Sequence, residues 1–228
     1  EISLGLVGSE MCIRDRAPSV GDSSSKTSSK AWHKIDGVCY NGSGKKVEGA
    51  ITRGMDVSEW QGKINWKEAK KDLDFAFVRI SYGTRHLDDY YDYNMTEAEA
   101  ADVPVGTYVY SLAKTNKEAL AEAQLAIRQM QGHKVSYPVA FDLEDEATLG
   151  TLTRKEISQI ALTFCDEIRK AGYTPILYMN LNWYNNFVDW NVLEGSGLDV
   201  WIASYGDTIL APSASKYKSV SYTHLRAH

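Results

Sequence analysis

The chain has 228 residues, of which 43% are hydrophobic, and carries a formal net charge of −5 at pH 7. This length and apolar content are sufficient for one large globular domain or two small ones. The acidic balance argues against nucleic acid as a partner, because binding to phosphates requires a clustered basic surface. No apolar run reaches the roughly 18 residues of a transmembrane helix, so no membrane partner is expected. The cysteines are few and widely spaced, and they predict neither a disulfide framework nor a metal site: Cys12, Cys39 and Cys165.

Both ends of the chain have unusual sequences. Residues 1–16 and 219–228 resemble peptides translated from sequencing-adapter DNA, so we exclude them from the fold prediction as non-native segments. Residues 17–31 are rich in Ser, Lys and Thr and predict a disordered linker. Residues 32–52 combine a tryptophan with the turn signal YNGSG and predict a small lead-in hairpin. The chain is therefore expected to be a fragment whose main domain covers residues 53–218.

The main domain alternates between strand-like and helix-like patterns. Repeated strand–helix units with continuous apolar strands indicate a parallel sheet, and their number within about 150 residues favours a barrel over an open sheet. Cys165 lies on the inner face of the last expected helix and is predicted to be a core residue. The expected strands lie within residues 54–58, 75–83, 103–111, 136–146, 174–180 and 199–206, and the expected helices are 64–73, 89–101, 116–131 and the segment between Thr153 and Gly172.

The fourth expected strand, in residues 136–146, ends in a cluster of carboxylates. Asp142 and Glu144 are two residues apart, and side chains at this spacing on a strand share one face. Neighbouring carboxylates repel, so one of them tends to keep its proton and can serve as a general acid. In a barrel, catalytic groups gather at the carboxyl ends of the strands. A polar strand end that runs into a solvated acidic loop is the alternative interpretation.

The other expected strands also end in acids, amides, hydroxyls and aromatic rings, without Lys, His or Cys. Such a set suits a carbohydrate ligand, because aromatic rings stack on sugar faces and carboxylates act on the acetal. No metal and no cofactor are expected from it. The residues concerned are Asp56, Ser58, Trp60, Gln61, Ser81, Tyr82, Tyr108, Tyr110, Ser111, Tyr178, Asn180, Trp201, Ala203 and Tyr205.

The order and spacing of seven motifs make about residues 53–207 similar to the family 25 glycoside hydrolases, which are bacterial and phage lysozymes (N-acetylmuramidases). The motifs are GMDVSEWQGKINW, FVRISYG, VPVGTYVYS, SYPVAFDLED, KAGY, ILYMN and WIASY. The resemblance implies an α/β fold, a modified TIM-like (β/α)5(β)3 barrel. It also implies cleavage of the β-1,4 bond between N-acetylmuramic acid and N-acetylglucosamine. The expected protein is a monomer that acts on bacterial peptidoglycan, outside the cell or at the cell wall.

The resemblance also assigns roles to individual residues. Glu144 matches the general acid of the family, and Asp142 matches the acid that stabilises charge at the sugar or orients its 2-acetamido group. Asp56 matches a carboxylate in the same subsite. The family is regarded as retaining, with assistance from the substrate's own N-acetyl group. The expected sugar-binding residues are Tyr82, Tyr110, Tyr178, Asn180, Trp201 and Tyr205.

The chain departs from the family pattern after WIASYG. The family continues there with two further strands, the last of which supplies another active-site acid, whereas this chain continues with ILAPSASKYK into residues 219–228. We therefore expect a barrel that lacks its last two strands and exposes unpaired edges on its first and sixth strands. Such a fragment is expected to be a poor enzyme.

Three alternative functions share some of these features. A chitinase-like barrel also has an Asp-x-Glu at this place, but within a longer DxxDxDxE run, whereas the residues before Asp142 are apolar. A non-catalytic wall-binding barrel, or an interaction protein on a decayed barrel, has no need of acids at the strand ends. The presence of Asp56, Asp142 and Glu144 therefore favours an enzyme.

Overall fold

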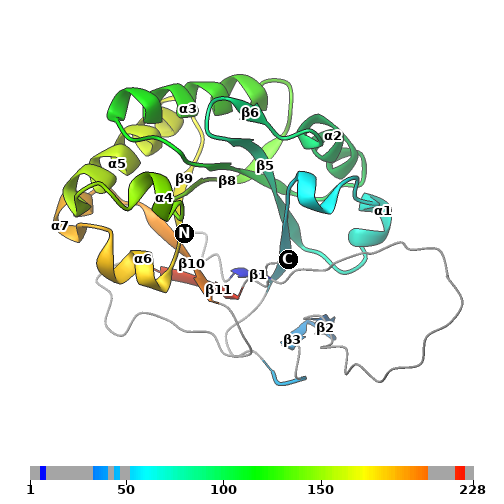
Figure 1. Cartoon of the computed structure of the whole chain (residues 1–228). Coiled ribbons are helices and arrows are strands. Elements are labelled where there is room, and N and C mark those ends of the chain that lie inside the picture. Colours follow the sequence, from blue (N-terminus) through cyan, green and yellow to red (C-terminus); the bar gives the residue numbers. More distant parts are fainter. Residues whose placement is uncertain (1–5, 9–32, 41–43, 47–51, 205–218, 224–228) are drawn as a thin grey trace, which may run out of the picture.

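The computed structural model of the chain describes residues 6–8, 33–40, 44–46, 52–204 and 219–223 (Figure 1). The described residues form one nine-stranded sheet and one separate two-stranded sheet. The large sheet is curled, and the longer helices cover its outer face (Figure 1). The prediction of a TIM-like α/β architecture with a parallel sheet is thereby confirmed. Among the described residues, no helix has the length and apolar character needed to cross a membrane.

The large sheet follows the order β1-β4-β5-β7-β8-β9-β10-β11, with parallel pairing at each step, and β6 pairs antiparallel with β5. Each of the six expected strands of the main domain is present. The bounds are β1 Leu6–Gly8, β4 Thr52–Val57, β5 Phe75–Tyr82, β6 His86–Leu87, β7 Val105–Tyr110, β8 Val135–Asp142, β9 Pro175–Asn180, β10 Asp199–Ser204 and β11 Ser219–Thr223.

The helices connect these strands. Their bounds are the 3-10 helix η1 Glu59–Gln61, α1 Trp66–Ala69, α2 Tyr91–Ala100, α3 Asn116–Met130, α4 Glu146–Leu149, α5 Arg154–Lys170, α6 Leu181–Asn186 and α7 Trp190–Leu193. The helix expected over residues 64–73 is reduced to the four residues of α1. The chain turns towards β5 directly after it, and Arg53 holds that turn through a 2.7 Å hydrogen bond from Nη1 to the carbonyl of Asp72.

The two longest helices begin and end where local sequence signals place them. Thr115 caps α3, and Thr153 forms a reciprocal capping box with Glu156 at the start of α5. Gly132 and Gly172 follow these helices with φ of 89° and 91°, the left-handed conformation that glycine adopts readily. The helices α3 and α5 pack against each other, and Cys165 is fully buried in the core, as predicted.

The alternation of side chains in the strands separates two apolar clusters. Val139, Phe141 and Leu143 belong to the large core beneath the helices. Ala140 belongs to a smaller cluster inside the curl of the sheet, together with Phe75, Phe77, Ile176, Tyr178, Trp201 and Ala203. Because side chains two apart share a face, Asp142 follows Ala140 on the inner side, at the carboxyl end of β8.

Both ends of the sheet differ from the prediction. The strands β4 and β10, which were expected to be unpaired edges, pair in parallel with β1 and β11 respectively. These partner strands come from residues 1–16 and 219–228, the segments excluded from the fold prediction. An edge strand presents unpaired N–H and C=O groups, and backbone pairing with them does not depend on a particular sequence. Composition alone therefore could not predict this pairing.

The two-stranded sheet is an antiparallel hairpin of β2, His33–Ile35, and β3, Val38–Tyr40. Its turn consists of Asp36 and Gly37, both with positive φ, 48° and 79°, as in the tight turns that join two strands directly. Around the YNGSG signal, Tyr40 forms a further, isolated antiparallel bridge with Lys46. The linker expected at residues 17–31 lies outside the described residues.

Candidate active site

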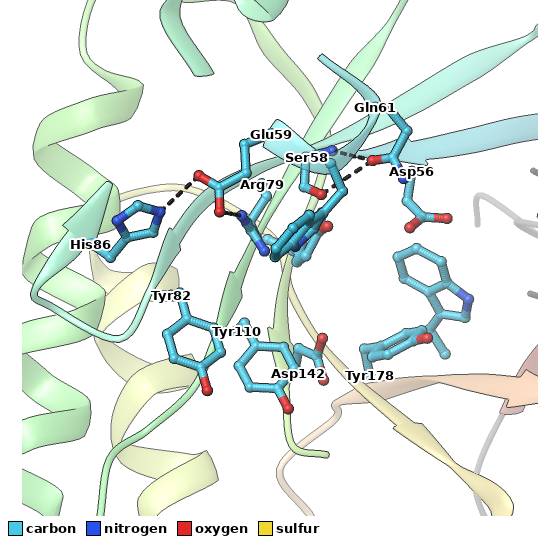
Figure 2. A pocket seen from close by; sticks show the side chains of 13 residues that line it. Asp56, Ser58, Glu59, Gln61, Arg79, Tyr82, His86, Tyr110, Asp142 and Tyr178 are labelled. Carbon is cyan, nitrogen blue, oxygen red and sulfur yellow. Dashed lines mark hydrogen bonds and ion pairs between the residues drawn. The ribbon is translucent and has the colours of Figure 1, made fainter. Parts of the chain in front are cut away.

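A cavity of about 440 Å³ lies at the carboxyl ends of the parallel strands, inside the curl of the sheet (Figure 2). This is the end at which barrel enzymes place their reactive groups. Its walls consist mainly of carboxylate, aromatic and hydroxyl side chains, together with one arginine and one histidine. The lining residues are Asp56, Ser58, Glu59, Trp60, Gln61, Arg79, Tyr82, His86, Tyr108, Tyr110, Asp142, Tyr178 and Trp201.

Most of the expected site residues lie together in this pocket. Those that line it are Asp56, Asp142, Tyr82, Tyr110, Tyr178 and Trp201. Glu144 and Asn180 are not among the lining residues, and Tyr205 lies outside the described residues. The roles assigned to all of these residues remain predictions.

Asp142 is the acid most deeply set in the pocket, with 4% of its surface exposed. In the sheet, Asp142 is paired with Tyr110 of β7 on one side and with Tyr178 of β9 on the other. Figure 2 shows its carboxylate directed into the same space as that of Asp56, which comes from β4.

Burial, and next the charge of Asp56, raises the pKa of the Tyr108 hydroxyl well above its usual value. Tyr108 therefore stays protonated in this acidic pocket.

Glu144 lies two residues beyond Asp142, the last residue of β8. The backbone nevertheless stays attached to the sheet, because the amide of Leu143 donates to the carbonyl of Tyr178 at 3.0 Å. Glu144 is half-buried, and its Oε1 atom is shielded from solvent. Glu144 is thus a partly desolvated carboxyl group on a held backbone, and its role as general acid remains a prediction.

The residue that follows, Asp145, fixes the other side of Glu144. The hydroxyls of Tyr82 and Tyr110 both donate to Asp145 Oδ2, at 3.2 and 3.3 Å. Asp145 Oδ1 accepts from the amide of Thr148 at 2.7 Å and so caps α4. Burial, and next the charge of Asp145, raises the pKa of the Tyr82 hydroxyl. The sequence prediction did not identify Asp145, although its place before a short helix is a capping signal.

A charged network forms the wall next to β5 and β6. Glu59 forms an ion pair with Arg79, with 2.8 Å between Oε1 and Nη2, and its other oxygen lies 2.7 Å from His86 Nε2 (Figure 2). Arg79 Nε also binds Asp88 at 2.9 Å. Burial raises the pKa of the Glu59 carboxyl, but the hydrogen bond with His86 and the charge of Arg79 outweigh it, so this pKa lies below its usual value.

Sequence reasoning missed Glu59, Arg79 and His86 as pocket residues. The sequence did contain a signal for Arg79. It is a charged residue that continues the inward-facing series of Phe75 and Phe77 in a mostly apolar strand. For Glu59 and His86 the sequence offered no such signal, because their contact joins η1 and β6, and the two residues are 27 positions apart.

Aromatic rings form the inner wall of the pocket. Trp201 packs edge-on against Tyr178 with centroids 4.6 Å apart, and it lies 4.7 Å from Phe77 in a tilted contact. Both Trp201 and Tyr178 are buried. Asn180, by contrast, caps α6, because its Oδ1 accepts from the amide of Trp183 at 3.1 Å.

Fold and site together define a TIM-like barrel protein with an acidic, tyrosine-rich pocket at the carboxyl ends of its strands. The model of the glycosyl hydrolases family 25 matches residues 55–225, and the chain belongs to this family. The match extends into the segment that contains β11.

Related proteins share the central part of the chain. The uncharacterized protein YegX of Escherichia coli K12 is 26% identical over 166 residues, which are 67% of this chain and 56% of YegX. Lysozyme M1 of Streptomyces globisporus is 26% identical over 164 residues, 68% of this chain and 55% of that protein. The chain thus spans just over half the length of these relatives. The modular autolysin LytC of Streptococcus pneumoniae has a similar fold, with a TM-score of 0.66, 22% identity and coverage of 78% of this chain and 44% of LytC.

Proposed function

We propose that this chain is a peptidoglycan hydrolase of the lysozyme type, which cleaves the β-1,4 bond between N-acetylmuramic acid and N-acetylglucosamine. The observation that carries the proposal is that Asp56 and the buried Asp142 line one pocket in a chain of family 25. The similarity to a protein named lysozyme supports the same substrate class. The enzyme acts as a monomer on bacterial peptidoglycan, outside the cell or at the cell wall.

In the proposed reaction, Glu144 donates its proton to the glycosidic oxygen while the bond from that oxygen to the sugar C1 breaks. The carbonyl oxygen of the substrate's 2-acetamido group bonds to C1, and Asp142 stabilises the positive charge that this ring closure creates. Water then attacks C1 and gives a proton to Glu144, while the bond between C1 and the acetamido oxygen breaks and the acetamido group is restored. The two successive inversions at C1 retain its configuration. Asp56 adds negative charge on the facing wall, which favours the cationic transition state.

The surroundings of the acids support these roles. Leu143 and Asp145 are both hydrogen-bonded, so the short segment with Glu144 is held at both ends. The rings of Tyr178 and Trp201 supply an apolar surface for the sugar face. The tyrosine hydroxyls bound to Asp145 limit the movement of the loop above that surface.

The products of peptidoglycan digestion test this proposal. Purified peptidoglycan is incubated with the chain, new reducing ends are reduced with borohydride, and the fragments are identified by mass spectrometry. The proposal predicts reduced N-acetylmuramic acid at the new ends. Reduced N-acetylglucosamine ends, cleaved stem peptides, or no new ends at all would each contradict it.

A further inference from the structure

Trp60 combines high exposure with a position at the pocket. Its side chain lines the cavity, yet 80% of its surface is exposed, more than that of the other large exposed hydrophobic residues in the described part of the chain. These are Ile35, Tyr82 and Leu87. A single exposed aromatic residue is unremarkable on a protein surface, so its meaning depends on how it is held.

The backbone on both sides of Trp60 is fixed by hydrogen bonds. Trp60 is the central residue of η1, whose ends are joined because both the amide and the hydroxyl of Ser58 donate to Gln61 Oε1, at 2.8 and 3.1 Å. The amide of Glu59 donates to Asp88 Oδ2 at 2.8 Å. The turn therefore holds an exposed indole on a rigid support.

The side chain of Glu59 adds a second anchor. Its two carboxylate oxygens bind Arg79 and His86, and Arg79 is itself buried and bound to Asp88. The four side chains thus hold one another and the turn, and none of these contacts involves the indole ring. Because the backbone that carries the indole is already held, a ligand that binds to the ring has to order only the side-chain torsions of Trp60.

We propose that Trp60 is the stacking platform of an outer subsite, which binds an N-acetylhexosamine unit of the glycan strand away from the bond that is cleaved. The inference rests on the proposed function. The inner sugar face already has Tyr178 and Trp201, which are 7% and 5% exposed, whereas Trp60 presents its ring to solvent at the rim. A β-1,4-linked polymer that enters the pocket must cross a rim, and the C–H face of a pyranose ring is complementary to an indole.

An outer subsite gives binding energy that depends on the length of the glycan. Calorimetric titration of the full chain with β-1,4-linked N-acetylglucosamine oligomers of two, four and six sugars measures this dependence. We expect affinity to rise with length in the unchanged protein. Trp60→Ala should weaken binding of the longest oligomer about tenfold and change binding of the shortest less than about twofold, while Trp60→Phe should retain most of the affinity.

Leu87→Ala is the matched control, because Leu87 is also an exposed apolar residue near His86 but does not line the cavity. It should leave the titrations unchanged. Thermal unfolding followed by circular dichroism should show similar midpoints for all variants, because surface substitutions change stability little. Equal loss of affinity for all three lengths in Trp60→Ala, or no loss for the longest, would overturn the inference.

Digestion of peptidoglycan, measured in parallel, separates this inference from the proposed function. Length-dependent binding through Trp60 without muramidase products would refute the proposed reaction and leave the subsite in place. Muramidase products together with titrations that are the same in Trp60→Ala and the unchanged protein would refute the subsite alone.

Discussion

Tyr82 and Tyr110, at the ends of neighbouring strands, stack with ring centroids 4.7 Å apart and planes 17° apart. Both hydroxyls bind the same oxygen of Asp145, so the stacked pair fixes the residue next to Glu144. The wall of the pocket and the loop that carries the proposed general acid are thus one hydrogen-bonded unit.

The first prediction concerns Asp145 as a positioning residue. Asp145→Ala removes the acceptor for both tyrosines and the cap of α4, so we expect turnover on peptidoglycan to fall about tenfold and stability to fall by about 1 kcal/mol. Asp145→Asn keeps a capping oxygen and should retain most of both. A purely structural role would lower stability but leave kcat of the folded enzyme unchanged. Kinetics with denaturant unfolding of both variants distinguish these cases, and normal kcat in Asp145→Ala would refute the positioning role.

Much of the fold was predictable because its signals are local. The strand at Phe75–Tyr82 is rich in aromatic and β-branched residues, and α5 has a capping box at its start and a glycine with positive φ after its end. The short helices α4, α6 and α7 were not predicted, because four to six residues are too few to show a helical period.

The site was predicted only in part, because only some of its residues are placed by local sequence patterns. Asp56 and Asp142 are strand residues, so alternation and the common edge of parallel strands bring them together. Asp145 and Glu59 make their contacts at the pocket with residues of β5 that are distant in the sequence, and no local pattern indicates these contacts. Glu144 was expected beside Asp142 by alternation, but β8 ends before it.

The second prediction concerns the pH dependence of stability. Glu122, on α3, is 2% exposed and accepts from the hydroxyl of Ser111 at 2.8 Å and from the amide of Leu112 at 2.9 Å. Burial raises its pKa from 4.5 to about 7. The folded state therefore holds a proton that the unfolded state releases, and stability should decrease as pH rises from about 4.5 to about 7 and then level off.

Glu122→Gln cannot ionise and should lack this decrease. Relative to the unchanged protein, it should gain on the order of 3 kcal/mol in unfolding free energy between pH 4.5 and pH 8. Urea unfolding at pH 4.5, 6 and 8 measures the difference, with Glu99→Gln on the exposed face of α2 as control. Parallel pH profiles for Glu122→Gln and the unchanged chain would contradict the prediction.

The third prediction concerns the sheet edge at β10. Deletion of residues 219–228 removes β11 and exposes the N–H and C=O groups of β10 that pair with it. We expect a lower melting temperature and concentration-dependent aggregation, because an open parallel edge can pair with another molecule. Deletion of residues 224–228 alone leaves β11 intact and serves as control. If both deletions melt like the full chain, β11 does not contribute to the stability of the fold.

The assignment of Glu144 as proton donor is the central claim, and the turnover of Glu144→Gln on peptidoglycan tests it most directly. The substitution keeps the size of the side chain but removes the acidic proton, so turnover should fall by roughly 10²-fold or more while the melting temperature and glycan affinity stay close to those of the unchanged chain. Glu146→Gln, an exposed acid in the same segment, should keep full activity. Turnover of Glu144→Gln equal to that of Glu146→Gln would contradict the account.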